Sequence, residues 1–243
     1  MVRHCTVGIW MSTSSDVLSE CKQIHAPADC RIPLLDLRAR PTHERVIAKI
    51  ENVVATTDLG QRLDLDAILK MTPGAKYNPQ TFPGLVYKLK KPRTTTLLFG
   101  TGKMVCTGAK STKSAKTAIA HIIKELKSQG IIIFTNPDTE IENIVASCDL
   151  HGTIDLEMVT ERLCKTMYEP EQFPGLIYTM TEPKSVLLVF ASGRIVCVGA
   201  KTEADMHLAI EKLRETLELN QLISRTESLP RIQETVSELK PYV

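Results

Sequence analysis

The chain has 243 residues, of which 43% are hydrophobic and 24% charged, and its formal net charge is +2. These values are typical of a globular protein that can bury a core, and no apolar run approaches the roughly 20 residues of a membrane-spanning helix. The first residues lack a signal peptide's basic start and apolar stretch, and the seven cysteines include no CxxC pair. We therefore expect an intracellular protein in a reducing compartment.

The small net charge conceals a division along the chain. Residues 46–130 contain 14 Lys and Arg against 5 Asp and Glu, whereas residues 131–220 contain 7 against 15. The first stretch therefore carries +9 and the second −8. Such asymmetry indicates different partners, with the basic part suited to a polyanion and the acidic part to a basic protein.

The first elements in chain order are a flexible segment, a strand and a short helix. Residues 1–44 show no sustained periodicity, and we expect a flexible extension there. Residues 46–56 alternate like a strand, with Asn52 and Val54 on one face. Asp64, like Asp155 further along the chain, precedes a short amphipathic segment, and both are expected to cap those helices rather than act as catalytic acids.

Three strands and a long helix follow. Strands are expected at 84–90, 94–99 and 103–109, and Gly100-Thr101-Gly102 supplies a tight turn between the last two. Ser111 is expected to begin the long helix. Its apolar stripe consists of Ala115, Ala118, Ile119, Ile122 and Leu126.

The whole series recurs 91 residues later without a gap. Phe82-Pro83-Gly84-Leu85-Val86-Tyr87 returns as Phe173-Pro174-Gly175-Leu176-Ile177-Tyr178, and Gly108-Ala109-Lys110 returns as Gly199-Ala200-Lys201. Roughly 28 of 77 positions match between 50–126 and 141–217, which indicates a duplicated unit. We predict one repeat at 45–130, a second at 131–220, and a polar tail at 221–243 with a short helix over 232–239.

Strands joined by tight turns are antiparallel, and each repeat has helices enough to cover only one face of its sheet. We therefore predict an α+β fold with a bare sheet face. Alternation directs Cys106 and its repeat mate Cys197 toward the helices, where thiols act as small hydrophobes. It directs Phe99, Leu97 and Val105 to the bare face. An apolar patch of this size predicts a binding surface.

Two strings carry a family resemblance. YNPQTFPGLVYKLKKPRTTTLLFGTGKMVCTGAKS and its partner YEPEQFPGLIYTMTEPKSVLLVFASGRIVCVGAK resemble the TATA-box-binding proteins of archaea and eukaryotes. The resemblance covers about residues 46–220, and both repeats match in order and spacing. It implies two pseudo-symmetric repeats that form one curved antiparallel sheet, a saddle with helices on its convex face and DNA against its concave face.

The resemblance also implies roles for single residues. Four rings would insert between DNA bases and kink the duplex, namely Phe82, Phe99, Phe173 and Phe190. Minor-groove contacts are implied for Asn52, Val54, Leu97, Val105, Thr107, Asn143, Val145, Leu188, Val196 and Val198. Phosphate contacts are implied for Lys88, Arg93, Lys103, Lys110, Lys184, Arg194 and Lys201. An acidic loop that resembles the docking surface for transcription factor B contains Glu169, Glu171 and Gln172.

Base chemistry agrees with these implied roles. The minor groove of A·T pairs displays only acceptors, whereas G·C adds a guanine amino group that an apolar surface disfavours. Steps such as TA also unstack most easily. The resemblance thus implies a general transcription factor that binds the TATA box and nucleates assembly with transcription factor B and RNA polymerase. We expect it to need no enzyme activity, metal, cofactor or small-molecule substrate. We expect it in an archaeal cytoplasm or nucleoid, or else in a eukaryotic nucleus.

Three departures from the family pattern leave alternatives open. Thr179 stands where an arginine is common, Glu182 adds an acid, and Val198 replaces a second threonine, so the second repeat should hold phosphates less strongly. One alternative is a diverged paralogue that binds factors with weak TATA preference. Another is a nuclease-type accessory module, although the sequence contains no phosphate-binding loop, nucleophile grouping or metal spacing. The only repeated carboxylates outside the caps are the pairs Glu51/Glu142 and Asp58/Asp149.

Overall fold

The computed structural model describes residues 46–134 and 137–225. Ten strands form one antiparallel sheet, in the order β2-β3-β4-β5-β1-β6-β11-β10-β9-β8. The first repeat supplies β1 (Lys49–Asp58), β2 (Lys76–Asn78), β3 (Phe82–Leu89), β4 (Thr94–Phe99) and β5 (Lys103–Ala109). The second supplies β6 (Glu140–Asp149), β8 (Thr166–Met167), β9 (Leu176–Met180), β10 (Ser185–Val189) and β11 (Arg194–Ala200). The predicted single sheet through both repeats is confirmed.

The two repeats meet where β1 pairs with β6. In this seam Asn52 lies opposite Val145, and Val54 lies opposite Asn143. The pairing is antiparallel, so the asparagine of each repeat faces the valine of the other repeat, and the two contacts are related by a pseudo-two-fold axis. The pseudo-symmetry seen in the sequence is therefore expressed in the register of the sheet.

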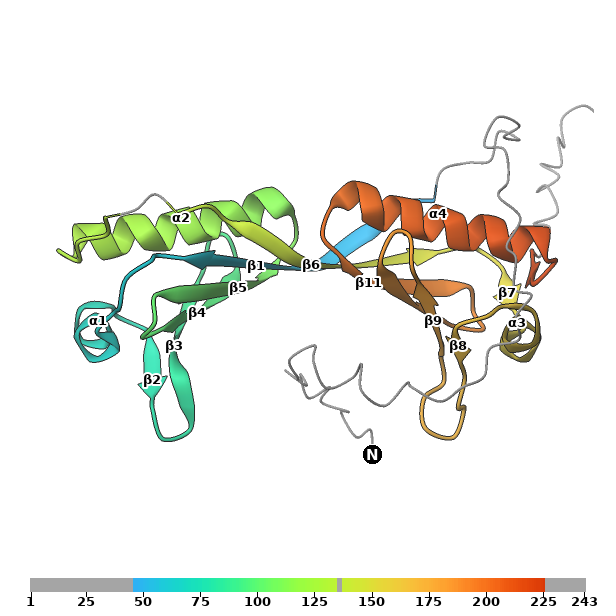
Figure 1. Cartoon of the computed structure of the whole chain (residues 1–243), viewed down its shortest axis with the longest axis horizontal. Helices are drawn as coiled ribbons and strands as arrows, with labels where there is room; N and C mark the ends of the chain where they lie inside the picture. Colours follow the sequence, from blue (N-terminus) through green and yellow to red (C-terminus); the bar gives the residue numbers. More distant parts are fainter. Residues whose placement is uncertain (1–45, 135–136, 226–243) are drawn as a thin grey trace, which may run out of the picture. The chain divides into compact units, whose positions relative to one another are not determined.

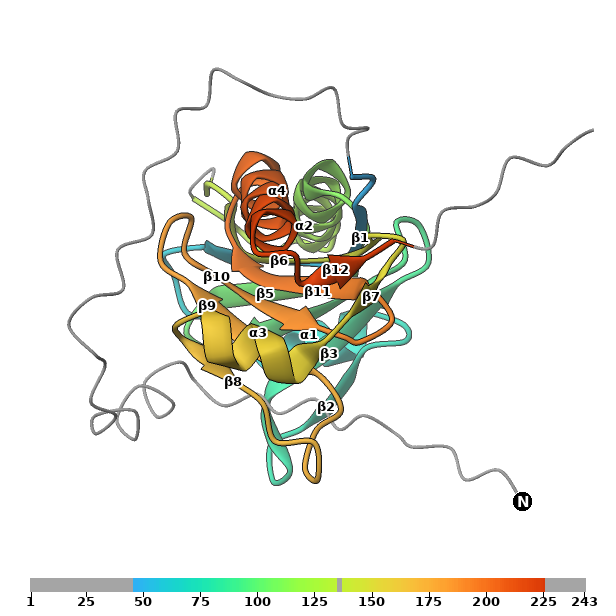
Figure 2. The ribbon, with the colours of Figure 1, turned by 90° about the vertical axis from the view of Figure 1, so that its right-hand side faces the viewer.

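The helices are α1 (Leu65–Met71), α2 (Thr112–Ser128), α3 (Leu156–Arg162) and α4 (Glu203–Leu219). Figures 1 and 2 show α2 and α4 together over one face of the sheet, while the β2–β3 and β8–β9 loops project on the other side. The predicted caps are present. The Asp64 carboxylate accepts two N–H groups at the start of α1, and Asp155 does the same for α3.

The core lies between the sheet and these helices. On β4 and β5 the side chains of Leu98, Met104 and Cys106 are fully buried, and the residues that alternate with them are half-buried. On α2 the buried residues are the five of the predicted stripe. Burial raises the pKa of Cys197 to about 11, so this thiol stays protonated and unreactive. The predicted assignment of strand faces is confirmed.

The turn between β4 and β5 also matches the prediction. Gly102 donates its N–H to the Phe99 carbonyl at 2.9 Å and has a φ of +95°. A Cβ on Gly102 would come within 2.0 Å of the Gln61 carbonyl oxygen. Glycine is needed here both for the left-handed backbone and for the close approach of the neighbouring loop.

Two features differ from the sequence interpretation. The strand β3 begins at Phe82 and not at residue 84 as expected, so Phe82 and Pro83 also lie within it. The segment after 220 is not all tail, because β12 (Ile223–Ser224) pairs with β7 (Thr153–Ile154). The predictions for residues 1–44 and for a helix at 232–239 fall outside the described residues.

Candidate nucleic-acid interface

The four predicted inserting rings form two matched pairs. Phe82 and Phe99 have ring centroids 5.9 Å apart at an interplanar angle of 62°, and Phe173 and Phe190 have centroids 5.8 Å apart at 65°. All four side chains are half-buried, and none belongs to the core beneath the helices. Edge-to-face packing is a favourable arrangement for two aromatic rings and contributes about 0.5–1.5 kcal/mol per pair beyond the area that the rings bury.

A glycine beneath each ring pair makes this packing possible. A Cβ on Gly84 would lie 2.6 Å from Phe82 Cε1 and 3.0 Å from Phe99 Cε1. A Cβ on Gly175 would lie 2.7 Å and 2.9 Å from the corresponding ring atoms of its own pair. The rings therefore rest directly on backbone. The sequence analysis gave Gly84 and Gly175 no role, although the repeated FPG string was the available signal.

The two central asparagines sit beside matching β-bulges. Between Val53 and Ala55 of β1 there is one residue, whereas the facing part of β5 contains two, Thr107 and Gly108. The strand β11 has the same irregularity opposite β6. An extra residue of this kind leaves a backbone N–H outside the ladder. The side-chain amides of Asn52 and Asn143 accept hydrogen bonds from these N–H groups.

The bulges fix the direction of each amide. The Gly108 N–H donates to Asn52 Oδ1 at 2.7 Å, and the Gly199 N–H donates to Asn143 Oδ1 at 2.8 Å. Because only the oxygen can accept these N–H groups, the Nδ2 group of each asparagine is turned the other way. Two amide donors are thus presented near the middle of the sheet, next to Val54 and Val145.

The symmetry between the two amides is broken by one hydroxyl. Asn52 Nδ2 lies 3.3 Å from Thr107 Oγ1, and the same hydroxyl lies 3.4 Å from Asn52 Oδ1. The equivalent residue beside Asn143 is Val198, whose side chain has no polar atom. The second repeat therefore presents its amide without a hydroxyl neighbour.

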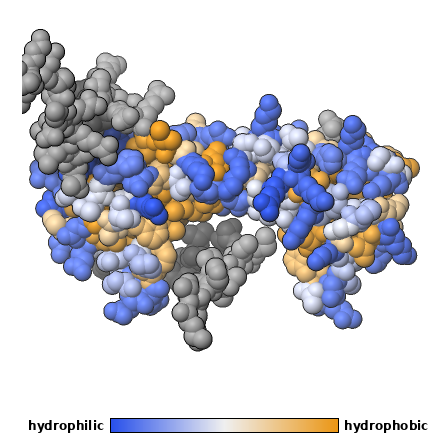
Figure 3. Space-filling model, turned by 180° about the vertical axis from the view of Figure 1, so that it is seen from behind, coloured by the Kyte–Doolittle hydropathy of each residue, from blue (hydrophilic) through white to orange (hydrophobic). Residues whose placement is uncertain are grey.

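Apolar side chains flank this centre on the same face. Leu97 pairs with Val105 across β4 and β5, and Leu188 pairs with Val196 across β10 and β11. All four are half-buried, in alternation with core residues. Figure 3 shows hydrophobic patches on both repeats beside the hollow between them, with hydrophilic side chains at the projecting tips. The predicted lining residues are brought together on one face.

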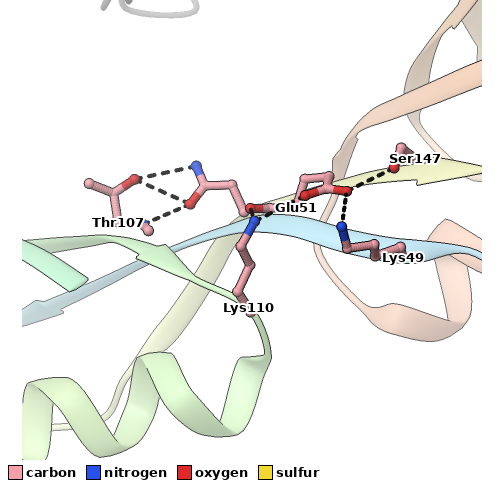
Figure 4. A network of polar contacts seen from close by, with 7 residues as sticks. Lys49, Glu51, Thr107, Lys110 and Ser147 are labelled. Atoms are coloured by element: carbon pink, nitrogen blue, oxygen red, sulfur yellow. Dashed lines mark hydrogen bonds and ion pairs between the residues drawn. The ribbon is translucent and has the colours of Figure 1, made fainter. Parts of the chain in front are cut away.

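Two carboxylates at the seam were noticed in the sequence but given no role. The Glu51 carboxylate contacts Lys49 Nζ at 3.2 Å, Lys110 Nζ at 3.0 Å and Ser147 Oγ at 3.0 Å (Figure 4). Hydrogen bonds from Lys110 and then Lys49 lower the pKa of Glu51 to about 2. In the second repeat, Glu142 pairs with Lys201 at 3.0 Å, and the Lys201 hydrogen bond is the largest cause of its lowered pKa.

The predicted phosphate-contacting residues thus fall into two groups. Lys110 and Lys201 are held by carboxylates, and Arg194 Nε lies 4.0 Å from Asp149 Oδ2. All seven predicted cations are exposed. Within 46–134 and 137–225, four of them form no ion pair, namely Lys88, Arg93, Lys103 and Lys184.

The acidic loop lies between β8 and β9, at the tip of the second repeat. Glu169, Glu171 and Gln172 are exposed. The Glu169 carbonyl accepts N–H groups from Gln172 and Phe173, each at 2.9 Å, so the loop closes as a turn beside the second ring pair. Two carboxylates are in this way displayed next to the rings but directed into solvent.

The described residues include no group of three or more His, Cys, Asp or Glu placed to hold a metal ion. Among the helices of this part of the chain, none combines the length and the apolar character needed to cross a membrane.

Comparisons with known proteins identify the arrangement. A family model described as transcription factor TFIID (or TATA-binding protein, TBP) matches residues 47–129 and again 138–219. The TATA-box-binding protein of Pyrobaculum calidifontis is 50% identical over 169 residues, which cover 70% of this chain and 85% of that protein. The one from Sulfolobus acidocaldarius is 47% identical over 173 residues, which cover 71% and 88%.

A solved structure agrees with these relatives. Methanococcus jannaschii TBP matches the fold with a TM-score of 0.66 and 44% sequence identity, over 71% of this chain and 98% of that chain. The repeated match of the family model spans both halves of the sheet, and it includes the ring pairs and the two bulge asparagines. The chain belongs to the TATA-binding protein family.

Proposed function

We propose that this chain is a non-enzymatic general transcription factor that binds the TATA box in the DNA minor groove, kinks the duplex and nucleates assembly of the initiation complex. The observation that carries the proposal is the single sheet face on which two ring pairs flank two amides fixed by bulges. Membership of the family supplies the class of ligand.

At the centre, Asn52 and Asn143 would donate from Nδ2 to acceptors on the floor of the groove. A·T pairs offer only acceptors there, so both donors are satisfied. A G·C pair would place its amino group against Val54, Val145 or the amide donors themselves, and a buried donor without an acceptor is costly. Selectivity for A·T pairs follows from these donors and from the apolar surface around them.

At each end, one ring pair would enter a base step and partly unstack it. Opening a step costs a few kcal/mol. That cost is offset by apolar area buried when the widened groove covers residues such as Leu97 and Leu188. Pyrimidine–purine steps open most easily, so the deformation adds sequence preference at positions that no side chain reads.

Around the rim, the exposed cations would hold the phosphates. Lys88, Arg93, Lys103 and Lys184 are available without rearrangement, whereas Lys110 and Lys201 must share their carboxylate partners with DNA. Release of counterions then makes the affinity fall steeply with added salt. The second repeat, with Thr179 in place of the commoner arginine, would contribute less to phosphate binding.

The acidic loop would supply the docking site for a protein partner. Glu169, Glu171 and Gln172 face solvent beside the second ring pair, and they suit a basic surface such as we propose for transcription factor B. RNA polymerase would follow through that factor. We propose an archaeal cytoplasm or nucleoid as the location, because the named relatives are archaeal proteins.

Bending measured by energy transfer between dyes at the two ends of a TATA duplex tests the wedge assignment. Phe99→Ala and Phe190→Ala should each reduce bending and weaken binding by tenfold or more, at about 1.4 kcal/mol per tenfold, without changing the melting temperature of the free protein by more than a few degrees. Leu219→Ala, at an exposed apolar position on α4, serves as the control. Normal bending by both phenylalanine variants would exclude the wedges.

One observation keeps a second function in view. Val198 lacks the hydroxyl of the threonine that the family pattern has at this position, and Thr179 lacks the charge of the commoner arginine. Both departures favour a paralogue that binds transcription factors with weak TATA preference. A mobility shift with TATA and G·C-rich duplexes of equal length separates the two functions. Equal affinity for both duplexes would support the paralogue.

A further inference from the structure

The outer parts of the two half-sheets differ in charge. In the first repeat, Lys88 at the end of β3 and Lys90 just after this strand are exposed cations. Their counterparts 91 residues later are Thr179 on β9 and Thr181 just after it, and both are exposed. The second repeat therefore lacks two positive charges at a place where the first repeat has a predicted phosphate contact, Lys88.

A cation from another part of the chain lies next to these two threonines. Lys165 follows α3 and directly precedes β8. Its carbonyl accepts the Thr179 N–H at 3.0 Å, and its Nζ donates to Thr181 Oγ1 at 2.6 Å. The lysine is thus bonded through its backbone to one threonine and through its side chain to the other. It brings a positive charge to the edge that lacks the two lysines of the first repeat.

The backbone conformation at Lys165 is unfavourable for a residue with a side chain. Its φ is +62°, in the left-handed region, and its counterpart in the first repeat is Gly74, with a φ of +90°. Within 46–134 and 137–225, Lys165 is the only lysine or arginine with a positive φ. Glycine adopts this conformation without steric cost, so the lysine lowers stability relative to glycine here. Strained residues of this kind cluster at functional sites.

The ammonium group of Lys165 is available to a ligand. The residue is exposed and forms no ion pair in the described part of the chain. An ammonium group has three N–H donors, and the hydrogen bond to Thr181 uses one of them. The nearby Glu182 accepts from Lys212 Nζ through its backbone carbonyl at 2.8 Å. Its carboxylate forms no ion pair with Lys165.

We propose that Lys165 is a phosphate-binding residue of the second repeat and that it replaces part of the charge missing at Thr179 and Thr181. The proposal rests on the proposed binding of DNA, and it adds a contact that the family resemblance does not assign. An ammonium group makes a strong, charge-assisted hydrogen bond to a phosphate oxygen. Because the Thr181 hydroxyl already orients the side chain, less rotamer freedom is lost when the phosphate binds.

The salt dependence of DNA affinity tests the proposal on the full chain. Lys165→Gln keeps the length and polarity of the side chain but removes its charge. A plot of log affinity against log salt should become shallower by about 0.9, the value for one phosphate contact. The same loss corresponds to weakening by roughly five- to tenfold at about 0.1 M salt. Lys116→Gln is the matched control, because Lys116 is exposed on α2, over the opposite face of the sheet (Figure 2), and it should leave the slope unchanged.

A glycine variant separates phosphate binding from a purely structural role. Lys165→Gly recreates the residue of the first repeat and removes the unfavourable left-handed backbone of a lysine. Its melting temperature should equal or exceed that of the wild type, while its salt slope falls as in Lys165→Gln. Adding Thr179→Lys to this variant places the charge where the first repeat has Lys88 and should restore the slope. A lysine that only stabilised the turn would give the reverse result, with a lower melting temperature and an unchanged slope.

The outcomes for Lys165 and for the proposed function are distinguishable. An unchanged slope in Lys165→Gln, or an equal loss in Lys116→Gln, would overturn the role of Lys165 alone. Equal affinity of the wild type for TATA and G·C-rich duplexes would instead overturn the TATA preference. Phosphate contacts do not depend on base sequence, so the slopes on either duplex would still test Lys165. A wild-type chain that binds neither duplex would overturn both.

Discussion

At the scale of single residues, the centre of the candidate interface depends on which atom of an amide faces outward. The backbone N–H groups of Gly108 and Gly199 occupy the oxygens of Asn52 and Asn143. The donors are therefore oriented before any DNA arrives, which removes the entropy cost of choosing between two amide rotations. The hydroxyl of Thr107 adds a further polar atom in the first repeat only.

Restoring that hydroxyl in the second repeat should tighten DNA binding. In Val198→Thr, the new hydroxyl can accept from Asn143 Nδ2 and donate its own proton toward a groove acceptor, as Thr107 can beside Asn52. One added hydrogen bond contributes about 0.5–1.5 kcal/mol, so the dissociation constant on a TATA duplex should fall severalfold. The converse variant Thr107→Val should raise it by a similar factor. Unchanged constants in both variants would mean that these positions do not contact the bases.

At the scale of elements, β3 serves as a floor for the first ring pair. Gly84 pairs with Phe99 across β3 and β4, and the rings of Phe82 and Phe99 rest where its side chain would be. In the second repeat Gly175, which directly precedes β9, lies beneath its ring pair in the same way. The wedge therefore depends on the backbone at a glycine as well as on the two rings.

Gly84→Ala should move the rings without unfolding the protein. The added methyl would meet ring atoms at the far ends of side chains that can rotate away, so the melting temperature should change little. The displaced rings should bend DNA less at one end of the site, which dye pairs placed at each end can resolve. Gly175→Ala should affect the other end. Full bending at both ends in the two variants would contradict the role of the glycines.

The seam between β1 and β6 places negative charge where DNA phosphates are expected. Glu51→Gln removes the negative charge that pairs with Lys110, which keeps its hydrogen bond to the backbone carbonyl of residue 51, and should make this lysine more available for phosphate. We expect severalfold tighter binding, and a plot of log affinity against log salt that is steeper by about 0.9 for one added phosphate contact. Glu157→Gln, which makes the same charge change on α3, is the control and should leave both quantities unchanged.

The pH dependence follows from the direction of the same pKa shift. The pKa of Glu51 falls from 4.5 to about 2, so its carboxylate stays charged from pH 8 down to pH 5. Its contribution to stability is fully present above pH 4.5 and is lost as the pH falls toward 2. DNA affinity in wild type and Glu51→Gln should therefore differ by a constant factor between pH 5 and 8. A ratio that drifts across that range would indicate another titrating group.

At the scale of the whole molecule, the sequence was sufficient for whatever depends on local periodicity or on the duplication. The repeat, the hairpin turn at Gly102, the caps at Asp64 and Asp155, and the burial of Cys106 were all predicted and are confirmed. The assignments of rings, amides and cations to DNA remain predictions. Their placement on one sheet face is what the structure adds.

What escaped prediction depends on contacts between segments far apart in the chain. The bulge at Thr107 and Gly108 arises from the register between β1 and β5, which periodicity within either strand does not reveal. The start of β3 at Phe82, two residues before the predicted residue 84, was missed because proline is rare inside strands and the pairing of Phe82 with Asn78 of β2 is not visible in the sequence.

The continuous sheet also bears on how the protein came to have two halves. A lone copy of the unit would expose the edge of β1 that pairs with β6 in this protein. The backbone donors and acceptors of this edge would be unsatisfied, and such an edge tends to pair with another strand. Residues 46–130 produced alone should therefore associate into a homodimer through this edge, which sedimentation equilibrium can measure. Gene fusion would then have tethered two chains that already assembled, and left each half free to diverge in charge.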